Sequence, residues 1–187
     1  PIDKLIVATN ENDILHRAIS KGDYVSKEVK ETLSPSMDIQ LASNFERLIY
    51  YVNNSDSEKT AEIMKKVKQN SYQIEKNNLD IIQKDFLSES CNEQETLEII
   101  KKNYEENNMI LDPHTAVGVG AAKKLSFNDC VVLSTAHPCK FPDATNNAIN
   151  KHEKLPEELQ FVLNKDENFK LLNNNTEEVK KFVKSKV

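Results

Sequence analysis

The feature that most constrains the fold of this chain is an apolar run at residues 130–133 that stops abruptly at polar residues. Cys-Val-Val-Leu is followed at once by Ser134, Thr135, Ala136 and His137. A short, continuously apolar run of this kind is typical of a strand buried in a parallel sheet. Because ligands in open α/β sheets collect at the carboxyl ends of the strands, the residues that follow predict a binding site.

Further short apolar runs alternate with helical patterns along the chain, and this alternation predicts an α/β fold. We expect strands at 4–9, 86–90 and 130–133, with a last short one at 166–172. Helices are expected at 14–20, 39–52, 56–70, 92–107, 116–125, 156–164 and from 176 to the end. Thr115 is the expected cap of the helix at 116–125.

Composition excludes several classes of protein. The chain has 187 residues and a formal net charge of −5, so it lacks the basic surplus of a general nucleic-acid binder. It has no apolar run of the roughly 20 residues that a membrane-spanning helix needs. Three cysteines at irregular spacings suggest neither a disulfide framework nor a zinc site. We therefore expect a cytoplasmic protein that inserts into no membrane.

Ionisable and hydroxyl side chains gather between residues 112 and 137. Asp112 and His114 occupy the loop before the helix at 116–125, and His137 follows the apolar run. Such groups can ligate a metal, but an Asp and a His two residues apart are a common spacing, so we expect no metal and interpret the histidines as structural. Ser134 and Thr135 lack the glycine-flanked turn of a hydrolase serine. A hydroxyl at a strand end can instead donate to the ring nitrogen of a ligand.

Two other places offer candidate site residues. Asn10 follows the strand at 4–9, where either ligand binding or simple turn formation explains it. Asn44 and Arg47 are three residues apart in the helical pattern at 39–52. An arginine there can hold a phosphate, whereas a surface ion pair is the structural alternative.

Four segments resemble threonine synthases, pyridoxal-phosphate enzymes of the tryptophan-synthase-β-like fold, also called fold type II. They are KLIVATNENDIL at 4–15, SPSMDIQLASNFERL at 34–48, LDPHTAVG at 111–118 and LSTAHPCKFP at 133–142. They occur in the order found in the family. Residues 55–92 and 143–187 match only loosely.

The resemblance implies an open, mostly parallel sheet flanked by helices, with residues 1–150 as the C-terminal portion of a cofactor-binding core and 151–187 as a helical extension. It implies conversion of O-phospho-L-homoserine and water into L-threonine and phosphate. In this fold type a Ser or Thr hydroxyl holds the pyridine nitrogen, and Thr135, beside Ser134, matches that position. The remaining pocket candidates, for the substrate or its phosphate, are Asp112, His114, His137, Lys140, Asn44, Arg47 and Asn10.

One departure from the family pattern is serious. The family's Schiff-base lysine and its phosphate-binding loop lie N-terminal to every matching segment, and neither is found in the 187 residues. We therefore expect the C-terminal part of a threonine synthase, inactive without its missing N-terminal part. The alternative is a non-catalytic module derived from the same fold that binds a metabolite or a partner.

Overall fold

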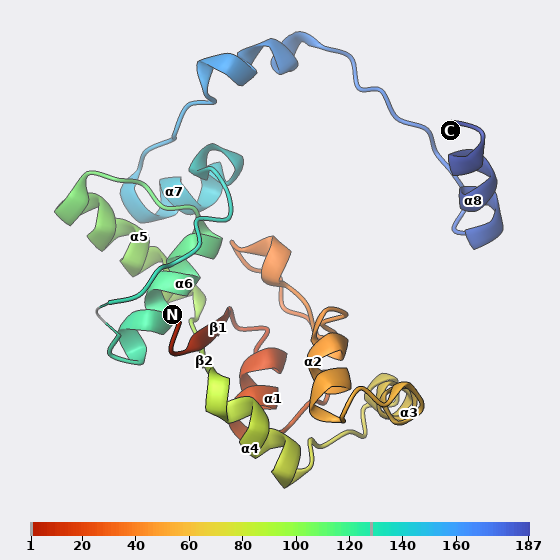
Figure 1. Ribbon diagram of the computed structural model, residues 1–187. Coiled ribbons are helices and arrows are strands. Elements are labelled where there is room, and N and C mark those ends of the chain that lie inside the picture. The colour runs from red at the N-terminus through yellow and green to blue at the C-terminus, as the bar shows by residue number, and fades with distance from the viewer. Residues whose placement is uncertain (1, 128) are drawn as a thin grey trace. The chain divides into compact units, whose positions relative to one another are not determined.

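The computed structural model describes residues 2–127 and 129–187 (Figure 1). The chain divides into two compact units, Pro1–Glu153 and Lys154–Val187, which we describe separately. That the first is a cofactor-binding core stays a prediction.

A two-stranded parallel sheet lies at the centre of the first unit. Strand β1, Leu5–Thr9, pairs with β2, Phe86–Ser90, in a register that sets Leu5 opposite Phe86 and Thr9 opposite Ser90. Both predicted strands are confirmed. Because the strands are parallel, the polar residues that end them, Thr9 and Ser90, emerge at the same edge of the sheet.

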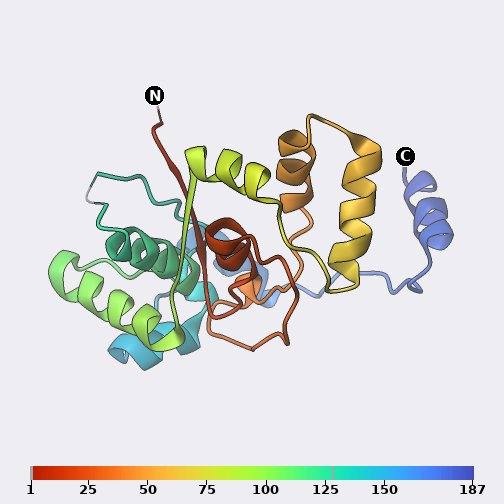
Figure 2. The ribbon, with the colours of Figure 1, turned by 90° about the horizontal axis from the view of Figure 1, so that it is seen from below.

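Helices cover both faces of this sheet, and the predicted α/β class is confirmed. Helix α1 lies on one side of the strands and α6 on the other (Figure 2). The helices of the first unit are α1 (Ile14–Lys21), α2 (Phe45–Val52), α3 (Ser57–Lys68), α4 (Lys76–Asp85), α5 (Glu93–Asn107), α6 (Pro113–Lys124) and α7 (Pro142–Ile149), with short 3₁₀ helices η1 (Pro35–Met37) and η2 (Pro138–Lys140).

Each side of the sheet has its own hydrophobic core. The first is built from α1, α2, α3 and α4 and includes the fully buried Ile14, Ile49 and Val67. The second joins α5, α6 and α7 through Ile100, Ala116 and Ala144, with Phe141 packed against it. Burying a side chain of Val or Ile size contributes about 1.5–3 kcal/mol, so each core stabilises its own half of the unit.

Small residues bring α6 very close to its neighbours. A Cβ added at Gly120 would lie 2.5 Å from Cys91 Sγ and 2.6 Å from Ile99 Cδ1. Burial, reinforced by the charge of Glu95, raises the pKa of the Cys91 thiol. Cys91 is therefore a protonated packing group beneath α6.

The structure corrects several sequence-based expectations. Residues 130–133 form neither a strand nor a helix, and the side chains of Val131 and Leu133 are 91% and 75% exposed. This apolar run has no strand partner within the described residues, so the buried-strand prediction is wrong for this chain. Residues 166–172 form no strand either.

Two helices begin elsewhere than expected. Helix α2 starts at Phe45: residues 39–42 are irregular, with Gln40 and Ala42 buried, and residues 43–44 form a turn. Helix α6 starts at Pro113 and is capped by Asp112, so the cap predicted at Thr115 is wrong. Helix α7, with few apolar residues, was not expected.

The second unit contains a 3₁₀ helix, η3 (Glu157–Asn164), and helix α8 (Thr176–Lys184). Asn175 caps α8 through its side chain, which accepts from the backbone N–H groups of Glu177 and Glu178. No residue of 154–187 is buried. Among the helices that the structure describes, none has the length and apolar character needed to cross a bilayer.

Candidate functional site

The N-terminus of α6 is organised by one buried carboxylate. Asp112 is 1% exposed, and its Oδ1 accepts hydrogen bonds from the backbone N–H groups of His114 (3.0 Å) and Thr115 (3.4 Å). Pro113 occupies the first helical position, where its missing N–H costs nothing. A carboxylate at this end of a helix also interacts favourably with the helix dipole. Asp112 is therefore buried and hydrogen-bonded where it starts the helix.

His114 connects Asp112 to a distant loop. Its Nδ1 lies 2.9 Å from Asp112 Oδ1, and its Nε2 lies 3.2 Å from the backbone nitrogen of Ser36 in η1. The ring also packs against Phe141, with centroids 4.6 Å apart. These contacts hold the side chain between three segments of the chain.

Thr115 connects the same carboxylate to the segment after the apolar run. Its hydroxyl donates to Asp112 Oδ2 and accepts from the backbone N–H of Thr135 at 3.3 Å. Ser134 and Thr135 themselves are exposed. Among the hydrogen bonds of the described residues, none uses the Thr135 hydroxyl. The backbone of Thr135 is thus held while its hydroxyl stays available to a ligand.

Asn10 holds the loop at 32–38 from its other side. It is 2% exposed, and its Nδ2 lies 2.8 Å from Thr32 Oγ1, 2.9 Å from Ser34 Oγ and 2.7 Å from Asp38 Oδ1. Asn10, after β1, and His114, in α6, therefore both form hydrogen bonds to the loop at 32–38. Asn10 Oδ1 also accepts from the backbone N–H of Asn12 at 2.9 Å, a local turn contact, while ligand binding by Asn10 stays a prediction.

Asp112, His114 and Thr115, with the backbone of Thr135, form one hydrogen-bonded cluster. His137 and Lys140 follow Thr135 closely in the chain and are exposed. The Nδ1 atom of His137 accepts from the backbone N–H of Cys139 at 3.2 Å and so caps η2. Lys140 Nζ lies 5.7 Å from the centre of the Phe141 ring, which itself contacts His114. Both side chains are therefore open to solvent.

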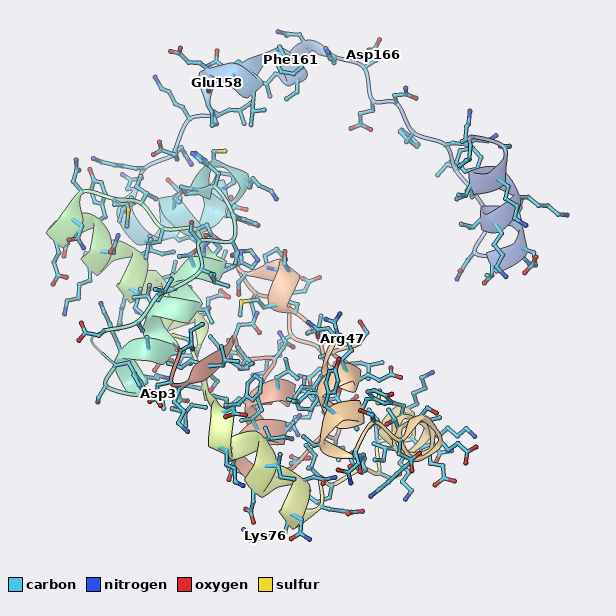
Figure 3. The ribbon with its side chains drawn as sticks, in the orientation of Figure 1. Asp3, Arg47, Lys76, Glu158, Phe161 and Asp166 are labelled. Carbon is cyan, nitrogen blue, oxygen red and sulfur yellow. The ribbon has the colours of Figure 1, made fainter. Side chains whose placement is uncertain are left out.

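The side chains of Asn44 and Arg47 form no part of the hydrogen-bonded cluster among the described residues. Both are exposed at the start of α2, where Figure 3 labels Arg47. The backbone N–H of Arg47 donates to the Asn44 carbonyl at 3.3 Å. Within the described residues, no hydrogen bond or ion pair joins either side chain to Asp112, His114 or Thr135.

Sequence reasoning identified Asp112, His114 and Thr135, but it missed two groups that join them. Thr115 is a bridging hydroxyl, and its position three residues after Asp112 was the available signal. Ser36 contributes a backbone N–H, which leaves no signature in a sequence. In the described part of the chain, no three His, Cys, Asp or Glu side chains are grouped as a metal site requires.

Comparison with known proteins gives the family context of this geometry. Residues 115–183 match the family model described as threonine synthase, C-terminal. The threonine synthase of Saccharomyces cerevisiae is 45% identical over 188 residues, covering 86% of this chain and 37% of that protein. That of Pseudomonas aeruginosa is 37% identical, covering 98% of this chain and 40% of that protein. The chain thus spans about two fifths of the length of these curated relatives.

Solved structures agree. The pyridoxal-phosphate-bound threonine synthase from Brucella melitensis superposes with a TM-score of 0.84 at 36% identity, over 99% of this chain and 40% of that one. The yeast threonine synthase gives 0.81 at 39% identity, over 98% of this chain and 42% of that one. From its matching segments, its fold and these likenesses, the chain belongs to the threonine synthase family.

Proposed function

We propose that this chain is the C-terminal part of a threonine synthase and forms one wall of its pyridoxal-phosphate pocket. The complete enzyme would convert O-phospho-L-homoserine and water into L-threonine and phosphate. The observation that carries the proposal is Thr135, whose backbone is fixed by Thr115 while its hydroxyl has no partner among the described residues. Support also comes from the Brucella melitensis relative, whose structure holds this cofactor.

The donor set fits a pyridine ring. A neutral hydroxyl can donate one hydrogen bond to a ring nitrogen without adding a charge. Thr135, with Ser134 next to it, supplies that group at an exposed position. When bound, the cofactor supplies an electron sink, and the protein's part is to hold and orient it. Thr135 would orient the ring through its nitrogen and leave that nitrogen largely unprotonated.

Cationic and polar groups around Thr135 would meet the substrate. Lys140 and His137 are exposed beside the cluster, and an ammonium or imidazolium there attracts a phosphate. Arg47 is better suited to a bidentate phosphate contact, with Asn44 next to it. Asp112, His114 and Asn10 are buried and would shape the pocket from behind.

Exposed apolar side chains support a larger assembly. The side chains of Val131 and Leu133 are 91% and 75% exposed. Removing such side chains from water is favourable by about 25 cal/mol per Å². We propose that the N-terminal part, which would also bring the Schiff-base lysine and the phosphate-binding loop, covers them. Without it the chain would be inactive.

The test replaces Thr135 in the full-length enzyme. Thr135→Val keeps the shape but removes the hydroxyl, and we expect a changed cofactor absorbance spectrum and slower phosphate release from O-phospho-L-homoserine. Thr135→Ser keeps the hydroxyl and should restore most of both. An unchanged spectrum and rate in Thr135→Val would remove Thr135 from this role.

A second measurement separates an enzyme from a non-catalytic module. Full-length protein loaded with cofactor should release phosphate, whereas residues 1–187 alone should not. Phosphate release by residues 1–187 alone would contradict the inactivity proposed for them. Cofactor binding without turnover in the full-length protein would favour the module.

A further inference from the structure

The contacts of Asp112 go beyond capping a helix. Oδ1 accepts from the backbone N–H and the imidazole of His114, while Oδ2 accepts from the hydroxyl of Thr115. A buried carboxylate is costly unless hydrogen bonds compensate it, and these donors do so. The contact between His114 Nδ1 and Asp112 Oδ1, at 2.9 Å, is an ion pair only if the imidazole carries a second proton. The site therefore depends on how His114 is protonated.

The structure assigns one protonation state to His114. The backbone N–H of Ser36 can only donate, so the Nε2 atom that faces it at 3.2 Å must be bare. The proton then resides on Nδ1, which donates to Asp112 at 2.9 Å. An imidazolium would set Nε2–H against the N–H of Ser36. Neutral His114 with its proton on Nδ1 satisfies both contacts.

Thr115 uses its hydroxyl in the same two-way manner. It donates its one proton to Asp112 Oδ2, and a lone pair accepts from the N–H of Thr135 at 3.3 Å. Valine at this position would keep the shape of the side chain and lose both contacts. The hydroxyl is therefore the link between the carboxylate and the segment that ends at Thr135.

We propose that Asp112 is a two-armed anchor that sets the position of both loops of the site. One arm runs through His114 to Ser36, 78 residues away, and the other through Thr115 to Thr135. His114 and Thr115 are positioning residues. They hold the backbone of Ser36 and Thr135 by hydrogen bonds and leave the Thr135 hydroxyl without a partner among the described residues. The anchor follows from the chain's own contacts, whereas its use in aiming Thr135 at a pyridine ring rests on the proposed function.

Amide hydrogen exchange tests each arm separately in the full-length protein. His114→Phe keeps a ring against Phe141 but removes the acceptor, so exchange should accelerate at Ser36, by about fivefold for one lost hydrogen bond, and not at Thr135. Thr115→Val should give the reverse pattern, and Thr115→Ser should restore protection at Thr135. Asp112→Ala should accelerate both. Equal changes at both loops in each single-arm variant, or no change, would overturn the anchor.

Thr60→Val is the matched control, because the Thr60 hydroxyl donates only within the first turn of α3, to the Asp56 carbonyl at 2.6 Å. It should leave both loops unchanged. Should Asp112→Ala fail to fold, ¹⁵N spectroscopy of histidine-labelled unmodified protein near neutral pH decides. His114 should show a protonated Nδ1 and a bare Nε2. A protonated Nε2 would overturn the proposal.

The cofactor spectrum distinguishes this proposal from the proposed function. If both hold, Thr115→Val changes the spectrum in the direction of Thr135→Val, and Thr115→Ser restores it. A spectrum that responds to Thr135→Val but not to Thr115→Val overturns the positioning role. A spectrum that responds to neither contradicts the proposed function, and the exchange pattern then decides the anchor.

Discussion

The hydroxyl of Thr115 accepts a hydrogen bond from the backbone N–H of Thr135, 3.3 Å away and 20 residues later in the chain. This contact fixes the polar end of a segment whose apolar residues are largely exposed: Val131 and Leu133 face solvent, while Val132 lies close to α6 at Gly118. A hydrogen bond from the buried N-terminus of α6 thus places the candidate hydroxyl. Hydrophobic burial of the segment itself contributes little within this chain.

Asn10→Ala should destabilise the first unit. The Asn10 amide contacts Thr32, Ser34 and Asp38, and all of these polar groups would lose a partner in a buried place. We expect a loss of about 2–4 kcal/mol in the free energy of unfolding, measured by chemical denaturation. Asn77→Ala, at an exposed position on α4, should stay within about 0.5 kcal/mol. Equal effects of the two variants would show that the Asn10 contacts contribute no stability.

Much of this fold follows from local pattern. The helix expected at 92–107 is found as α5, and the Asn92 side chain caps it in a capping box with Glu95. The strand at 86–90 is likewise confirmed, because an apolar pair bounded by polar residues finds β1 beside it. The prediction succeeds where the sequence pattern is local, as at the start of α5, or where a partner strand lies beside the segment, as at β2.

The rest depends on contacts between distant residues. Residues 130–133 have the pattern of a buried strand, but burial needs a partner strand, and none lies beside them in the described residues. Helix α7 buries only Ala144 and Thr145, too little for an apolar period. The pairing of His114 with Ser36 joins a side chain to a backbone group 78 residues away, which no spacing reveals. Asp112 and Thr135 stand out in the sequence as candidate site residues, but the hydrogen bonds that connect them do not.

Gly120→Ala should be costly and Gly118→Ala inexpensive, although both lie in α6. A Cβ at Gly120 would lie 2.5 Å from Cys91 Sγ, whereas one at Gly118 would lie 3.0 Å from a terminal methyl of Val132. We expect Gly120→Ala to lose about 1–3 kcal/mol of unfolding free energy through overpacking. Gly118→Ala should stay within about 1 kcal/mol, since alanine favours the helix by a similar amount. Adding Cys91→Ala should make Gly120→Ala less costly. Strictly additive effects would contradict the clash.

Asp13→Asn should destabilise the protein at neutral pH and progressively less in acid. Burial opposes ionisation of Asp13, but its hydrogen bond and attraction to Arg17, 2.8 Å away, and the charge of Lys27 together lower its pKa below 3.8. A carboxyl with a lowered pKa in the folded state stabilises that state above its ordinary pKa and loses the effect as the pH falls through the folded value.

Denaturation of wild type and Asp13→Asn between neutral pH and acid measures this difference, which should shrink below pH 3.8. Asp80→Asn is the control, because Asp80 forms an exposed pair with Lys76 and should contribute little at any pH. A difference that is constant with pH would show that the Asp13 charge does not stabilise the fold.

Tyr72→Phe should stabilise the protein. Tyr72 is 5% exposed, and its hydroxyl is buried without a hydrogen-bond partner among the described residues. Removing an unsatisfied buried hydroxyl should raise the free energy of unfolding by about 1 kcal/mol. Tyr24→Phe is the matched control: the Tyr24 hydroxyl donates to the Ala42 carbonyl at 3.1 Å, so its removal should lower stability by about the same amount.

The pH dependence supplies a second signature at Tyr72. Burial, with a contribution from the charge of Glu75, raises the pKa of Tyr72 to about 12. Because the unfolded chain releases this proton near its ordinary value of 10.0, the Tyr72 hydroxyl makes the folded state less stable as the pH rises from there toward about 12. The advantage of Tyr72→Phe over wild type should therefore widen above pH 10.0, the ordinary value for tyrosine. An advantage that is absent at neutral pH and does not grow in alkali would mean that the Tyr72 hydroxyl finds a partner, such as bound water, in solution.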